Sequence, residues 1–94
     1  MIENFHDKHT RALFELVKCH RKWRKFELVA LRKLSMLHAA KELKDLRSPP
    51  GNRLESLSGN RSGQHSIRIN SQYRVCFTWE NGNAFRVEIT DYHD

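Results

Sequence analysis

The stretch HSIRINSQYRVCFTW, residues 65–79, consists of two alternating segments separated by a short polar break. Alternation of apolar and polar side chains is typical of β-strands that bury one face. The apolar faces of an antiparallel pair must coincide, so Ile67 is predicted to lie opposite Val75, and Ile69 opposite Tyr73. The same register sets Arg68 directly opposite Arg74, although like charges across a strand pair are destabilising. This stretch therefore predicts a β-hairpin with an arginine pair on its polar face.

A third alternating segment, FRVEITDYH at residues 85–93, completes the predicted sheet. Its apolar residues lie opposite those of the preceding strand only if the connecting loop has an odd number of residues, here Asn81-Gly82-Asn83. The predicted pairs are Trp79 with Phe85, Phe77 with Val87 and, on the polar face, Arg74 with Thr90, with Tyr92 diagonally beyond.

The first half of the chain is expected to be mainly helical. Asp7 is placed to cap a helix that runs to about Lys18, and its inner side would carry Leu13, Leu16, Val17 and His20. A second helix, from about Phe26 to Leu46, has a broad apolar arc suited to covering a sheet. Pro49, Pro50 and Gly51 end the helical region.

The N-terminal stretch MIENF is short and apolar enough to form an edge strand. The predicted fold class is thus α+β, with an N-terminal strand and two helices packed on one face of an antiparallel sheet. The length of 94 residues favours one domain, residues 1–94, with a single modest core.

Charge is distributed unevenly along the chain. Lys and Arg number 17 against 11 Asp and Glu, which gives a net charge of +6 and makes a polyanionic partner worth considering. All basic residues after Lys44 are arginines, whose rigid fork suits phosphate oxygens. Arg47 and Arg53 are among them and are candidate RNA contacts.

The chain shows no sign of a secreted or membrane protein. Cys19 and Cys76 have neither a metal-like nor a CxxC spacing. The longest purely apolar run, residues 28–31, is far too short for a bilayer span, and no signal-peptide core is visible. We expect a cytoplasmic chain, and no residue pattern predicts a cofactor or a metal site.

The polar sheet face has a chemical interpretation. Arg68, Arg74 and the loop residue Arg61 would form a site that a phosphodiester neutralises, next to the C-terminal run TDYHD. RNA cleavage needs a base for the 2′-hydroxyl, charge stabilisation for the phosphorane and an acid for the leaving oxygen. Asp91 or His93 could be the base, and His93 or Tyr92 the acid. Tyr92 could equally stack on a nucleobase.

Simpler interpretations stand beside this one. Surface arginines often only diverge into water, and residues 91–94 could be a frayed terminus. The basic stretch KCHRKWRK, residues 18–25, fits a solvated turn better than a nucleic-acid contact. His6 and His9 are more often capping or surface histidines than metal ligands. His65 fits the edge of a core, and nothing near Cys76 in the sequence predicts an activated thiol.

The string LRSPPGNRLESLSGNRSGQHSIRINSQYRVCF, followed by VEITDYH, closely resembles the HigB branch of the RelE-like toxins of bacterial toxin–antitoxin systems. The resemblance covers nearly the whole chain. It implies a RelE-like fold, ribosome-dependent cleavage of mRNA, and silencing by a helix-turn-helix, HigA-like antitoxin.

Residue by residue, the resemblance matches Arg74 to the family's strand arginine that contacts the scissile phosphate. It matches Asp91, Tyr92 and His93 to the C-terminal catalytic run, whereas Arg61 and Arg68 fall where basic residues are usual. Some relatives carry histidine and lysine where this chain has Glu55 and Ser58. Two alternatives follow: Glu55 serves as a base, or the activity is weaker.

Two further functional hypotheses remain open. A non-catalytic module with the same fold would bind RNA, the ribosome or an antitoxin without cutting, and the basic residues Lys22, Arg24 and Lys25 would supply a contact. A DNA-binding accessory is disfavoured because no recognition helix is evident. Specific cuts in translated mRNA, as against binding without scission, separate the first two hypotheses.

Overall fold

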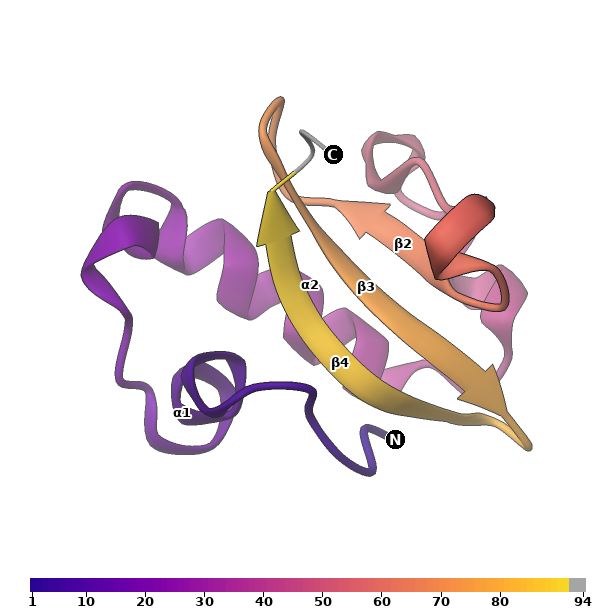
Figure 1. The fold of residues 1–94 in the computed structure, drawn as a ribbon, viewed down its shortest axis with the longest axis horizontal. Coiled ribbons are helices and arrows are strands. Elements are labelled where there is room, and N and C mark those ends of the chain that lie inside the picture. Colours follow the sequence, from indigo (N-terminus) through magenta and orange to yellow (C-terminus); the bar gives the residue numbers. More distant parts are fainter. Residues whose placement is uncertain (92–94) are drawn as a thin grey trace.

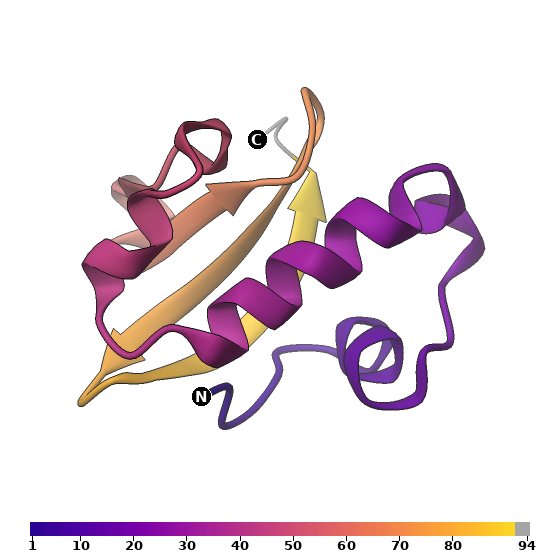
Figure 2. The same ribbon diagram turned by 180° about the vertical axis from the view of Figure 1, so that it is seen from behind.

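The computed structural model describes residues 1–91 and shows helices packed against one face of an antiparallel sheet (Figures 1 and 2). The sheet has the order β1-β2-β3-β4, and its strands are β1 (Glu55–Ser56), β2 (His65–Arg68), β3 (Tyr73–Glu80) and β4 (Asn83–Asp91). The long helix α2 (Glu27–Ala39) crosses behind the sheet in Figure 1 and in front of it in Figure 2. The predicted α+β architecture is confirmed.

The helix α1 (Lys8–Leu16) begins as predicted, because the Asp7 carboxylate accepts a 2.7 Å hydrogen bond from the Thr10 amide. The Thr10 hydroxyl in turn accepts a 3.1 Å bond from the Ile89 amide, which ties the helix to β4. The helix ends earlier than expected, since Val17 adopts a left-handed conformation with φ of 52°. Leu16 and Val17 are each 61% exposed, so their predicted place on the inner side is wrong.

The predicted single helix over residues 26–46 is wrong at its C-terminal end. A 3-10 helix, η1 (Arg21–Phe26), precedes α2, and a second, η2 (Leu43–Arg47), follows it. Ala40 takes an extended conformation, and the Asp45 carboxylate then accepts bonds from the Lys41 and Glu42 amides. This capping starts a new turn in a new direction.

The first β-hairpin has the predicted register, whereas the second has it only in the part beyond the bulge from its turn. Arg68 pairs with Arg74 and Arg74 with Thr90, as expected. The second turn has only two loop residues, Asn81 and Gly82, both with positive φ, so Trp79 pairs with Ala84 instead of Phe85. A bulge in β4 then restores the alternation, because Arg86 and Val87 together face the single residue Phe77.

The N-terminal stretch lies along β4 without forming a regular strand (Figure 1). Ile2 bridges Ala84 and Phe5 bridges Val87 in parallel orientation. The core between sheet and helices is built around Leu13, Leu34, Leu37, Ile67, Val75, Phe77 and Val87, all with no measurable exposure. None of the helices in residues 1–91 has the length and apolar character that a bilayer span requires.

Candidate active site

A pocket of about 750 Å³ opens on the polar face of the sheet, opposite the face that α2 covers. The loop of residues 57–64 and the N-terminal stretch form its walls, and β3 and β4 form its floor. The ionisable side chains that line it are His6, Glu55, Arg61, Arg74, Arg86 and Glu88.

Arg74 lies deep in this pocket. It is only 6% exposed, in contrast to the half-buried Arg68 across the hairpin, which does not line the pocket. The predicted arginine pair therefore exists, but only one of its members reaches the concave site.

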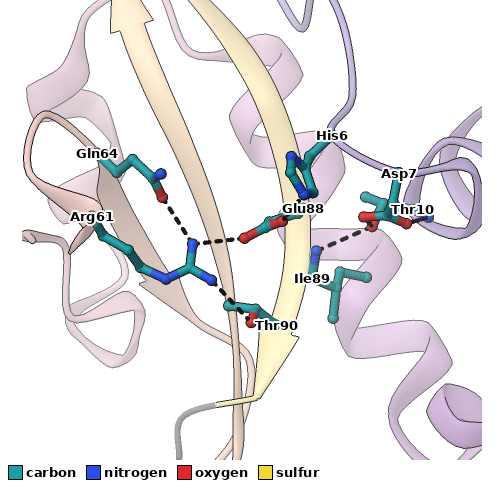
Figure 3. A network of polar contacts seen from close by, with 8 residues as sticks. All are labelled: His6, Asp7, Thr10, Arg61, Gln64, Glu88, Ile89 and Thr90. Atoms are coloured by element: carbon teal, nitrogen blue, oxygen red, sulfur yellow. Dashed lines mark hydrogen bonds and ion pairs between the residues drawn. The ribbon is translucent and has the colours of Figure 1, made fainter. Parts of the chain in front are cut away.

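Arg61 reaches the sheet from η4 (Gly59–Arg61), as the sequence interpretation required. Its Nη1 donates to the Glu88 carboxylate at 2.6 Å and to the side-chain oxygen Oε1 of Gln64 at 3.0 Å, and Nη2 lies 3.5 Å from the Thr90 hydroxyl (Figure 3). These three acceptors hold the guanidinium over β4, on the polar face that also carries Arg74.

Glu88 is the acid that the sequence interpretation missed. Its side chain is 13% exposed, and its second oxygen lies 3.2 Å from His6 Nε2 (Figure 3). The alternation of residues 85–93 placed Glu88 on the polar face. Nothing in the sequence near Glu88 identifies its partners, because Arg61 lies 27 positions and His6 lies 82 positions before it.

Cys76 lies beneath this cluster, fully buried between Ser66 and Glu88 in the sheet. Burial raises the pKa of its thiol, and this outweighs the opposing effect of Arg74 and Arg61. The thiol is therefore neutral at physiological pH, which is consistent with the absence of an activation signal in the sequence.

Glu55 stands at the rim of the pocket as an exposed carboxylate on β1, and Ser58 lines the same wall. The strand β1 also borders a smaller hollow of about 320 Å³ that holds Arg47, Lys44 and His65. Burial lowers the pKa of His65, and its Nδ1 lies 3.3 Å from the Ser56 hydroxyl.

Of the three C-terminal catalytic candidates, Asp91, Tyr92 and His93, the structure describes only Asp91. Asp91 pairs in register with Tyr73, one position beyond the Arg74–Thr90 pair, which assigns it to the opposite face of the sheet from Arg74. Its Oδ2 accepts a 3.1 Å bond from the Gln72 amide group. Tyr92 and His93 lie outside the described residues.

The basic stretch of residues 18–25 is more than a solvated turn, because most of it forms η1, with Trp23 buried. Lys22 and Lys25 line a hollow of about 380 Å³ beside the Phe26 and Tyr73 rings, while Arg24 is exposed. Arg53 is exposed and lines none of these three pockets. Within residues 1–91, no cluster of three or more His, Cys, Asp or Glu side chains could hold a metal ion.

A family model described as the RelE-like toxin of the type II toxin–antitoxin system HigB matches residues 3–93. The chain belongs to this HigB-like toxin family. It is similar to Toxin HigB-1 of Vibrio cholerae, with 46% identity over 90 residues and 95% of each chain covered. It is also 38% identical to a Haemophilus influenzae protein over 83 residues, covering 87% of this chain and 82% of that protein.

Solved structures show the same fold. The HigB-like chain matches a YoeB–YefM complex from Staphylococcus aureus with a TM-score of 0.56 and 16% identity, covering 100% of this chain and 99% of the other. It matches a YoeB dimer from the same organism with a TM-score of 0.55 and 18% identity, covering 99% and 95%. The family resemblance read from the sequence and the RelE-like fold are both confirmed.

Proposed function

We propose that this HigB-like toxin inhibits translation by cutting mRNA on the ribosome. The observation that carries the proposal is the concave site in which Arg61 and Arg74 come together with Glu55 at the rim. RelE-like toxins are generally endoribonucleases. The guanidinium groups of Arg61 and Arg74 suit the phosphate that such an enzyme must bind.

The chemistry requires no metal because the substrate carries its own nucleophile, the 2′-hydroxyl. Arg74 and Arg61 stabilise the charge of the phosphorane, and Arg68 adds positive potential from across the hairpin. Glu55 is the base candidate that lies at the pocket, while Asp91, Tyr92 and His93 remain candidates for base, acid and stacking roles.

Basic residues outside the pocket are proposed to hold the rest of the RNA or the ribosome. These are Arg47, Arg53, Lys22, Arg24 and Lys25. The partner that silences the toxin is proposed to be a helix-turn-helix, HigA-like antitoxin. Antitoxin binding is supported by the solved YoeB–YefM complexes of similar fold and by membership of a type II toxin family.

Expression of the protein alone, followed by mapping of mRNA 5′ ends, tests this function. We expect cuts confined to translated mRNA, with a 2′,3′-cyclic phosphate on the upstream fragment, because attack by the 2′-hydroxyl forms that product. His93→Ala should abolish the cuts. To test Arg74 in the same experiment, Arg74→Lys is a better variant than Arg74→Ala. Alanine would truncate a side chain that is only 6% exposed and would disturb the packing around it. Products with 5′-phosphates would contradict the mechanism.

A module that binds without cutting is the second candidate. It is favoured by the register position of Asp91, on the sheet face opposite Arg74, because a base on that face could not act at the Arg74 phosphate. Ribosome binding without new mRNA ends would support this candidate over the endonuclease.

A further inference from the structure

The bulge in β4 holds a residue in an unusual backbone conformation. Arg86 has a φ of 54°, in the left-handed region that glycine adopts readily and that costs other residues free energy. Such strain persists only where surrounding structure enforces it, and it is often found at functional sites. Its presence at an arginine raises the question of what that side chain does.

The N-terminal stretch enforces this conformation. Asn4 Oδ1 accepts a 2.6 Å hydrogen bond from the Arg86 amide, and the Asn4 carbonyl accepts a 3.2 Å bond from the Val87 amide. The Val87 carbonyl in turn accepts a 2.9 Å bond from the His6 amide. The two backbone amides of the bulge therefore both donate to one asparagine.

The bulge changes which side chains share the polar face. Phe85 pairs with Thr78, and Glu88 pairs with Cys76, so both belong to the face with Arg74. In a regular strand, two residues three positions apart would point to opposite faces. The extra residue of the bulge shifts the alternation by one position, so that Phe85 and Glu88 share a face. Arg86 is exposed and lines the pocket.

The charges around the pocket leave Arg86 available to a ligand. Arg61 is bound to Glu88, and Arg74 is buried. Within residues 1–91, by contrast, the Arg86 guanidinium makes no ion pair and no hydrogen bond. The pocket contains three arginines against two glutamates, so it suits an anion larger than the single phosphate that Arg74 would hold.

We propose that the bulge presents Arg86 as a third arginine of the substrate site, where it contacts a phosphate next to the scissile one on single-stranded RNA. Asn4 is the positioning residue that maintains the bulge. This inference rests on the proposed function, since it takes the ligand of the pocket to be RNA.

Binding of a 2′-O-methyl RNA oligonucleotide, which cannot be cleaved through its 2′-oxygen, tests the proposal by fluorescence anisotropy at several salt concentrations. Arg86→Gln should weaken binding by about tenfold and lower the slope of log K against log salt by about 0.7, the value for one single-strand phosphate contact. Arg11→Gln is the matched control, because Arg11 is exposed on α1 and pairs with Glu15. It should leave both quantities unchanged.

Arg86→Gly separates binding from strain. It should raise the melting temperature, because glycine tolerates the positive φ, while it weakens RNA binding as much as the glutamine variant does. Val17→Gly is the control for strain relief, since Val17 has a φ of 52° and does not line the pocket. It should raise the melting temperature without changing RNA affinity.

Asn4→Ala should weaken RNA binding in the parent and have no effect in the Arg86→Gln background, because Asn4 acts through Arg86. If the parent binds RNA and Arg86→Gln matches it in affinity and salt slope, this inference is overturned and the proposed function stands. If the parent binds no RNA on or off the ribosome, the proposed function fails and the inference fails with it.

Discussion

At Glu88, one carboxylate contacts two basic side chains from segments far apart in the chain. Arg61 Nη1 lies 2.6 Å from one oxygen and His6 Nε2 lies 3.2 Å from the other (Figure 3). A phosphate site without a ligand concentrates positive charge, and that repulsion destabilises the folded protein. Glu88 offsets part of this repulsion in the free protein.

Replacing Glu88 with glutamine tests this role. The variant keeps the shape and one acceptor oxygen but loses the charge, so a charge-assisted hydrogen bond becomes an ordinary one. We expect the free energy of unfolding to fall by about 1–2 kcal/mol, measured by urea denaturation. Glu15→Gln, which breaks the exposed Arg11–Glu15 pair, should change it by about 0.5 kcal/mol or less. Equal effects would show that Glu88 is no more than a surface partner.

The sequence predicted the site residues unequally. Arg68 opposite Arg74 followed from alternation, because the strand register is a local property of a short hairpin. The contact between Arg61 and the sheet was expected in outline, from a glycine-flanked loop. Glu88 and His6 were missed as partners, since the contact that defines them joins the N-terminal stretch to the last strand. Contacts of such long range have no signature in a single sequence.

The β3–β4 hairpin shows where pattern reasoning fails at the scale of an element. The pair Asn81-Gly82 is a strong signal for a two-residue turn, yet strict alternation demanded an odd loop. The two-residue turn and the alternation are compatible because the bulge at Arg86 adds one residue to β4 and so shifts the alternation by one position. A bulge that depends on a distant asparagine is invisible to alternation, whereas the cap of α1 by Asp7 is local and was predicted correctly.

The cost of a side chain in the β3–β4 turn can be tested by comparing Gly82 in that turn with Gly59 in η4. Gly82 has a φ of 81°, and an added Cβ would lie 3.2 Å from the Lys41 carbonyl oxygen. Gly59 has a φ of 62° with no atom within 4 Å of its added Cβ. Gly59→Ala should cost about 1–2 kcal/mol of unfolding free energy through backbone strain, and Gly82→Ala should cost more because the turn must also shift away from Lys41. Urea denaturation of both variants measures the difference, and an equal loss would mean that the Lys41 contact is relieved without cost.

For the whole molecule, whose net charge is +6, the fold brings part of the positive charge to one face of the sheet. The sheet turns one face to the helices and the core (Figure 2). The arginines of β3, β4 and the loop before β2 line the pocket on the other face. The pocket on that face is lined by Arg61, Arg74 and Arg86, so it is a candidate site for an anionic ligand. If the pocket binds anions in the folded state only, anions must stabilise the whole protein by mass action.

Sulfate should therefore raise the melting temperature more than sodium chloride of equal ionic strength does. At ten times its dissociation constant, a bound anion adds about 1.4 kcal/mol, which corresponds to several degrees for a chain of this size. Arg61→Gln should reduce this sulfate-specific shift, because the variant removes a guanidinium that is held in the pocket by Glu88, Gln64 and Thr90. Differential scanning calorimetry across a sulfate series gives the shift for each protein.

The control for this experiment is Arg11→Gln, which removes the same charge from the outer surface of α1. Preferential exclusion of sulfate stabilises any folded protein, so the parent and both variants share that contribution. Only the difference between Arg61→Gln and Arg11→Gln reports binding in the pocket, because both variants have the same net charge. Identical sulfate responses in the two variants would locate the anion effect outside the pocket and would remove Arg61 from the phosphate site.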